Sequence, residues 1–281
     1  MKKYTSLYKR HPEQNNQDVF AFFPFDTNLG ESWDSPFEKL ANLANPEDWH
    51  FKRPEFKSKY KNHRFPILTS YLNYTFLRIQ DLDYIVFSDD ENKAAFNTGL
   101  QTKQGKDIFA LFFKNSEAET RNQCDWTFYA FVDSYSEKMQ FYRQTPKLAK
   151  YIEDANDLVF DTNLEIDTNL GHIIERNIDR LPEALRGNTQ IALNVIVGAV
   201  QMLKHRVMRN YKVAIPHWYE NKIQLLLPLV LSNEENIADL ALVVDKDKIR
   251  NIYRGKTVLS MDQAYIDARL ITRPDSDWLN P

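Results

Sequence analysis

The sequence predicts an α+β fold, in which antiparallel sheets flank a helical block within a single compact domain. Two groups of short segments rich in β-forming residues carry this prediction, one in residues 84–132 and the other in residues 223–259. Helical patterns precede the first group and separate it from the second. This order differs from the strict alternation of strands and helices in a doubly wound sheet.

Composition indicates a folded protein in a reducing compartment. The 281 residues are 43% hydrophobic and 13% aromatic, which is sufficient for a sizeable core. Cys124 is the only cysteine, so no intrachain disulfide can form. The basic start of the chain is followed by no apolar run, and no stretch has the length and hydrophobicity of a membrane span. We therefore expect a cytoplasmic protein with no membrane partner, an N-terminal tail over 1–19, and one α+β domain over 20–281.

Helix signals justify the helical part of the fold. Ser35, Pro36 and Glu38 form an S-x-x-E capping pattern that predicts a helix from Ser35 to about residue 43. Apolar residues at helical spacing predict further helices over 67–82 and, most clearly, over 189–211. The apolar stripe predicted for the long helix consists of Ile191, Val195, Ile196, Ala199, Val200, Leu203 and Val207. Shorter helices are expected over 171–181 and 261–270.

Strand signals justify the two sheets. In the first group, turn residues separate the segments 84–88, 94–98, 108–113 and 126–132, and this spacing predicts an antiparallel meander. In the second group, strands are expected over 223–231, 240–244, 251–253 and 257–259. Pro228 lacks a backbone N–H, so the first of these is expected to be an edge or bulged strand.

The standard motifs of ATP-loop, Rossmann, zincin and serine-hydrolase sites do not occur in the sequence. The residues around Cys124 do not resemble a cysteine-protease motif, so this residue is interpreted as a small side chain entering a strand. A formal charge of −3 provides no general attraction for a polyanion. Residues 52–64 do combine Lys and Arg with aromatic side chains, which suits either RNA or a solvated linker.

Three groups of residues are candidate ligand contacts. On the helix predicted after Gly171, His172 and Arg176 lie one turn apart and Arg180 follows, so the group suits anion binding, with His172 as general acid or base. The alternative is a surface helix whose arginines pair with neighbouring carboxylates. Asn97, Thr98 and Gly99 end a predicted strand and could orient a ligand, or form an ordinary turn. Near the C-terminus the candidates are Tyr265, for stacking on a base, and Arg269 and Arg273, for phosphate.

Several sequence segments together resemble one family. They include FNTGL at 96–100, HIIERNIDR at 172–180, DLALVV at 239–244 and ITRPDSDWL at 271–279. These pieces, in this order, are similar to the domain of unknown function 3825 family, over roughly residues 20–279. The resemblance implies work on or near RNA or nucleotides, because such relatives are often joined to cold-shock, LOTUS-type or nuclease-like modules or linked with stress-response systems.

The leading hypothesis is a nucleotide- or RNA-binding domain that hydrolyses a phosphodiester or pyrophosphate bond. Arg78, Arg176, Arg269 and Arg273 would bind phosphate, and His172 would transfer the proton. The competing hypothesis is a non-catalytic protein-interaction module in a stress-response or RNA-associated complex, in which the arginines form ion pairs. A third is a metal-dependent hydrolase; Asp157, Asp161 and Asp262 would supply oxygen ligands for a divalent metal, but their spacing identifies none.

Overall fold

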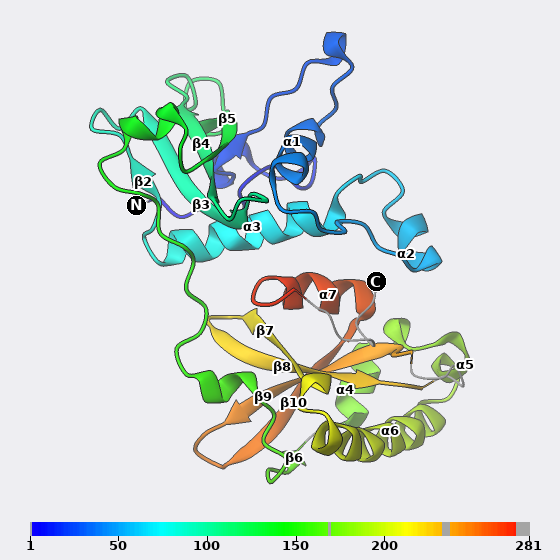
Figure 1. Ribbon diagram of the computed structural model, residues 1–281. Helices are drawn as coiled ribbons and strands as arrows, with labels where there is room; N and C mark the ends of the chain where they lie inside the picture. Colours follow the sequence, from blue (N-terminus) through cyan, green and yellow to red (C-terminus); the bar gives the residue numbers. More distant parts are fainter. Residues whose placement is uncertain (1, 168–169, 232–236, 274–281) are drawn as a thin grey trace. The chain divides into compact units, whose positions relative to one another are not determined.

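The structure, a computed structural model, describes residues 2–167, 170–231 and 237–273. Each of the two compact units, Met1–Lys150 (unit 1) and Tyr151–Pro281 (unit 2), contains one five-stranded mixed sheet with helices, and the predicted α+β class is confirmed (Figure 1). The sequence predicts a single domain over 20–281. The boundary at Lys150 falls where the sequence has neither a glycine nor a low-complexity stretch to mark it.

Unit 1 contains the predicted meander and one additional strand. Its sheet has the order β1-β5-β4-β3-β2, with antiparallel pairing from β2 to β5 and a parallel pairing of β1 to β5. The strands are β1 (Ala21–Phe22), β2 (Val86–Phe87), β3 (Lys93–Gln101), β4 (Asp107–Lys114) and β5 (Trp126–Asp133). The helices are α1 (Ser35–Leu43), α2 (Pro54–Lys59) and α3 (Pro66–Asp81).

One face of this sheet packs against α3, which contacts β3 (Figure 1). The core between them is aromatic. The ring centroids of Phe20 and Phe76 are 4.7 Å apart, and those of Phe96 and Phe112 are 5.7 Å apart. Such pairs contribute about 0.5–1.5 kcal/mol each beyond the area they bury. The helix α1 has the predicted bounds, but its N-cap is Asp34, one residue earlier than expected.

The N-terminal segment differs from the expected tail, because it is packed into unit 1. Leu7 is fully buried, and its backbone N–H donates to Asn73 Oδ1 on α3 at 2.9 Å. Gln80, also on α3, accepts from the Tyr4 N–H at 2.8 Å and donates to the Tyr4 carbonyl at 3.0 Å. These side chains satisfy backbone groups that would otherwise lose hydrogen bonds on burial.

Unit 2 has the sheet order β6-β10-β9-β8-β7. Its strands are β6 (Ile166–Asp167), β7 (Ile215–Tyr219), β8 (Lys222–Leu229), β9 (Leu240–Asp247) and β10 (Ile252–Ser260). Its helices are α4 (Leu170–Arg176), α5 (Glu183–Arg186), α6 (Thr189–Arg209) and α7 (Met261–Arg269). The sequence did not predict β7, and the two segments expected at 251–253 and 257–259 form the single strand β10.

The two faces of the unit 2 sheet bear different helices. Alternate residues of β8 and β9, such as Leu225 and Val244, form a core with α4 and α6. Figure 1 shows α7 on the other side of the sheet, where it packs mainly on β7. Within α6 the buried residues are Ala192, Ile196, Leu203 and Val207, whereas Ile191, expected in the stripe, is 52% exposed.

Two further details concern unit 2. The strand that contains Pro228 lies second from the edge, but β7 pairs with β8 only as far as Leu226. Pro228 therefore needs no N–H on that side, which explains why a proline is tolerated there. Contrary to the expectation from the sequence, α6 has the length and hydrophobicity of a membrane span, although core helices of soluble proteins have these properties as well.

Candidate nucleic-acid interface

The residues predicted to form a turn for a ligand are instead used within the sheet of unit 1. Asn97 and Thr98 are buried on β3. Asn97 Nδ2 donates to Asp107 Oδ2 at 3.1 Å, and Thr98 Oγ1 donates to the Ile108 carbonyl at 2.7 Å. Gly99 has φ +76°, and an added Cβ would lie 2.4 Å from Tyr71 Oη. These contacts favour a structural role for all three residues.

The predicted arginine and histidine ligands are distributed over both units. In unit 1, Arg78 Nε donates to the Lys150 carbonyl at 2.9 Å. In unit 2, His172 and Arg176 lie exposed on α4, and Arg180 donates from Nη1 to the Val258 carbonyl on β10. Arg180 therefore anchors its segment to the sheet.

The C-terminal candidates belong to the other side of the unit 2 sheet. Tyr265 is buried on α7 and Arg269 is half-buried at the end of the same helix, whereas Arg273 is exposed beyond it. Because α4 and α7 cover opposite faces of this sheet, His172 and Arg176 do not converge with Tyr265 and Arg269 on one pocket of unit 2. The roles assigned to them from the sequence remain predictions.

The contacts of the candidate metal ligands and of Cys124 bear on the metal-dependent hydrolase and cysteine-nucleophile interpretations. Asp157 forms an ion pair with Lys248 at 2.9 Å, and Asp161 Oδ1 accepts from the Asn163 N–H at 3.0 Å. In the described parts of the chain, no group of three or more His, Cys, Asp or Glu side chains has a metal-binding arrangement. Cys124 is buried, and burial raises the pKa of its thiol, which opposes a role as nucleophile.

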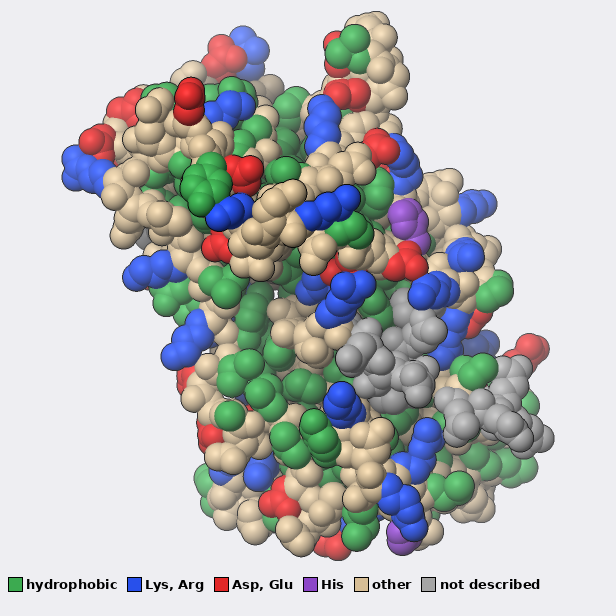
Figure 2. Space-filling model, viewed as in Figure 1, with side chains coloured by type: hydrophobic (Ala, Val, Ile, Leu, Met, Phe, Trp, Pro, Cys, Tyr) green, Lys and Arg blue, Asp and Glu red, His purple; other side chains and the backbone are tan. Residues whose placement is uncertain are grey.

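The basic segment 52–64 contains α2 and is partly neutralised. Lys52 lies 3.7 Å from Asp48, and Arg64 binds Glu38 at 2.5 Å. In the view of Figure 2, Lys and Arg side chains are interspersed with acidic and hydrophobic ones and form no single continuous basic patch. Charge alone therefore identifies no polyanion site on that face.

A different feature lies on the outer face of the unit 1 sheet, opposite α3. One in-register row of residues crosses four strands there. Phe22 on β1 pairs with Thr127 on β5, which pairs with Phe113 on β4, and Phe113 in turn pairs with Lys93 on β3. In-register neighbours project from the same face of a sheet. Phe22 is 54% exposed and Phe113 is 40% exposed, so two aromatic rings of this row face solvent.

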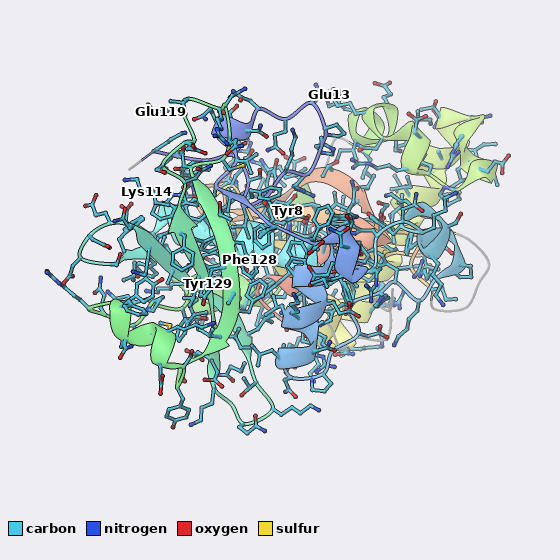
Figure 3. All side chains as sticks on the ribbon, turned by 90° about the horizontal axis from the view of Figure 1, so that it is seen from above. Tyr8, Glu13, Lys114, Glu119, Phe128 and Tyr129 are labelled. Carbon is cyan, nitrogen blue, oxygen red and sulfur yellow. The ribbon has the colours of Figure 1, made fainter. Side chains whose placement is uncertain are left out.

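A β-bulge brings a third ring to the row. Phe112 pairs with Phe128 and Leu111 with Ala130, which leaves Tyr129 as the extra residue of β5. Phe128, its neighbour in Figure 3, is buried, but Tyr129 is 46% exposed. The ring centroids of Tyr129 and Phe113 are 4.5 Å apart. The bulge thus turns Tyr129 toward the exposed face.

The segment after β5 contributes the remaining groups. Met139 and Tyr142 pack on a small core of Phe109, Leu111 and Val132, and Tyr142 Oη donates to the Ala94 carbonyl at 3.2 Å. Burial raises the pKa of Tyr142 to about 12, so this phenol stays protonated and keeps its donor at neutral pH. The segment is therefore fixed across part of the outer face.

The same segment places one lysine and one further ring beside the row. Lys138 Nζ lies 4.4 Å from the centroid of Tyr129. Lys93 Nζ lies 4.7 Å from the centroid of Phe141, which is 49% exposed. We call this set the aromatic row; it consists of Phe22, Phe113, Tyr129 and Phe141 with the lysines Lys93 and Lys138.

The aromatic row has the chemistry of a platform for unstacked bases. Exposed rings stack on the faces of nucleobases, and ammonium groups beside them can contact phosphate. The sequence did not single out these residues, because apolar residues follow one another in 108–113 and 126–132 without a regular alternation that would show which side chains are exposed. The one signal in the sequence was the high density of aromatic residues in these two segments.

A second unexpected feature is a buried polar group in unit 2. His217 on β7 is 2% exposed and lies opposite Gln224 on β8. Neither ring nitrogen has a hydrogen bond of normal geometry, and Nδ1 lies 4.0 Å from Asp267 Oδ2 on α7. Burial lowers the pKa of His217 to about 4, an effect that the nearby Gln224 amide partly opposes, and burial raises the pKa of Asp267 to about 7.

An ion pair would shift these two pKa values in the opposite directions, so desolvation outweighs mutual attraction at this distance. Between about pH 4 and pH 7 both side chains are therefore neutral. The strand β7 had not been predicted, which is why the sequence did not single out His217.

Comparison with known proteins places the chain in a family. Neither the curated proteins nor the solved structures that were compared match it. A family model, described as a domain of unknown function (DUF3825), matches residues 40–278 and so includes most of both units. The chain therefore belongs to this family, as its sequence segments had suggested.

Proposed function

We propose that unit 1 binds single-stranded RNA on its outer sheet face, through the aromatic row. The observation that carries the proposal is the in-register series Phe22–Thr127–Phe113–Lys93, extended by Tyr129 at 4.5 Å from Phe113. Strands lie about 4.8 Å apart, so Phe22 and Phe113 on either side of β5 are separated by about 10 Å. Two nucleotides, with one base stacked on each ring, can span this distance.

The lysines complete the site. Lys93 and Lys138 each lie within 5 Å of an exposed ring, so a base stacked on that ring would hold its phosphate near an ammonium group. The aromatic row holds no carboxylate, thiol or imidazole that could act as a general base. The proposal is therefore binding without hydrolysis.

The test is fluorescence anisotropy with a labelled eight-nucleotide single-stranded RNA and the full chain. A base stacked on an aromatic ring contributes about 1–3 kcal/mol, and half-exposed rings should lie at the lower end. The Phe113→Ala/Tyr129→Ala double variant should therefore weaken binding by about 2 kcal/mol, or roughly 30-fold in Kd.

Tyr211→Ala is the matched control, because Tyr211 is 61% exposed but belongs to unit 2. It should leave Kd unchanged, and a double-stranded RNA of the same sequence should bind more weakly because its bases are already stacked. If the wild type binds no single strand, or if the double variant binds as tightly as the wild type, the proposal is wrong. In that case the aromatic row would be the candidate surface for binding another protein.

A further inference from the structure

A depression of about 410 Å³ lies at the edge of β5, next to the aromatic row. It exists because β1 is short and pairs with β5 only as far as Thr127. Beyond that point no strand among the described residues covers this edge, and the chain from Pro24 to Glu31 forms the opposite wall together with α1. The volume lies within the range of about 300–1,000 Å³ that is common for small-molecule pockets.

The depression is continuous with the aromatic row through one shared side chain. Tyr129 belongs to the row and also lines the depression. Phe25 lines it as well and is 40% exposed. An RNA strand bound along the aromatic row would therefore reach a second site lined by aromatic side chains where it crosses the edge of the sheet.

The polar groups of the depression are mainly hydrogen-bond acceptors. Glu31 Oε1 accepts from Lys39 Nζ at 2.7 Å and Glu31 Oε2 accepts from the Asp26 N–H at 3.0 Å, so both oxygens are engaged. The hydrogen bond from Lys39 lowers the pKa of Glu31, which keeps it ionised. Asp26 Oδ1 accepts from the Asn28 N–H at 2.8 Å. Its Oδ2 has no hydrogen-bond partner within the described chain and remains available.

We infer that the depression receives a nucleobase and that Asp26 selects bases with an exocyclic amino group over uracil. Cytosine and adenine each offer an N–H₂ donor on the edge that a carboxylate can contact. Uracil carries its O4 carbonyl oxygen where cytosine carries the N4 amino group, and this oxygen faces the Asp26 carboxylate unfavourably. This inference rests on the proposed function and names the preferred substrate class at the same site.

The experiment compares labelled hexanucleotides of cytidine and of uridine, because two pyrimidines differ little in stacking. Anisotropy at neutral pH should show at least fivefold tighter binding of the cytidine oligomer by the wild type. Asp26→Asn keeps the Oδ1 acceptor for Asn28 and replaces the second oxygen with a donor. It should reduce the preference to less than twofold while Tm stays unchanged.

Glu13→Gln is the matched control, since Glu13 is an exposed carboxylate of unit 1 that Figure 3 shows apart from Tyr129. It should retain the full preference. Equal binding of both oligomers by the wild type, with the effect of Phe113→Ala/Tyr129→Ala intact, would overturn the base pocket and leave the proposed function standing. A preference that survives Asp26→Asn would overturn the role of Asp26. Binding of neither oligomer would overturn the proposed function itself.

Discussion

The two sheets of this protein use their second faces in opposite ways. In unit 1, the face away from α3 leaves aromatic rings in solvent, whereas in unit 2 the face under α7 buries His217 close to Asp267. Exposed rings contribute little to folding but are available to a ligand. Buried titratable groups cannot contact a ligand from bulk solvent, and they make the free energy of unfolding depend on pH. Substitutions on the first face should therefore affect binding, and those on the second should affect stability.

The largest expected effect is a change of stability with pH that arises from Asp267. Its pKa of about 7 in the folded protein lies above the ordinary value of 3.8, so folding favours the protonated form. The stability this group contributes is present below pH 3.8 and is lost as pH rises through 7. At about 1.4 kcal/mol per pKa unit, the loss is at most about 4 kcal/mol.

Asp267→Asn removes this ionisation. The variant should be more stable than the wild type by about 4 kcal/mol at pH 8.5 and by only about half of that at pH 5.5, where the unfolded carboxyl is already ionised but the folded one is still protonated. Urea unfolding at both pH values measures the difference. If the variant shows no relative gain at pH 8.5, the carboxylate is not desolvated as the structure indicates.

His217 should produce the next largest effect, on the acid side. Its pKa of about 4 lies below the ordinary value of 6.5, so folding favours the neutral ring. The corresponding stability is fully present above pH 6.5 and is lost as pH falls through 4, by about 3 kcal/mol in total. In His217→Gln, the difference in unfolding free energy between pH 6.5 and pH 4 should shrink by that amount, as measured by urea titration. An unchanged pH dependence would show that this ring is not the group responsible.

A smaller effect is expected for the aromatic row, and it should appear only in binding. Phe113→Ala alone should weaken binding of single-stranded RNA by about 1 kcal/mol, or roughly fivefold. Its Tm should change by no more than a few degrees, because the ring is 40% exposed. Thermal unfolding followed by circular dichroism measures this. A large loss of stability would mean that Phe113 belongs to the core, and the comparison between the two faces would fail.

The smallest effect concerns the lysines. If Lys93 and Lys138 each contact one phosphate, the logarithm of the binding constant should fall against the logarithm of salt concentration with a slope of about −1.4. Lys138→Ala should bring the slope to about −0.7 and change Kd by only two- to threefold. Anisotropy titrations at several salt concentrations give this slope. A slope that Lys138→Ala leaves unchanged would remove Lys138 from the phosphate contacts.

The contacts of individual residues show where prediction from the sequence failed. Asn97 and Thr98 are polar residues at an apparent strand end, but β3 continues to Gln101 and both side chains are hydrogen-bonded inside unit 1. The N-terminal segment looked like a polar tail because its partners, Asn73 and Gln80, lie far away on α3. Such partners are brought together only by folding, so no local pattern reveals them.

The α+β class, the meander of unit 1, α1, α3 and α6 could be predicted from the sequence, because these depend on apolar periodicity and turn residues within a few positions of each other. Which side of each sheet is covered could not be predicted, because it depends on how distant segments pack. The bulge at Tyr129, the short β1 that leaves the edge of β5 open, and the packing of α7 over His217 all depend on pairing between distant segments. A residue's exposure follows from that pairing, and so does its availability to a ligand.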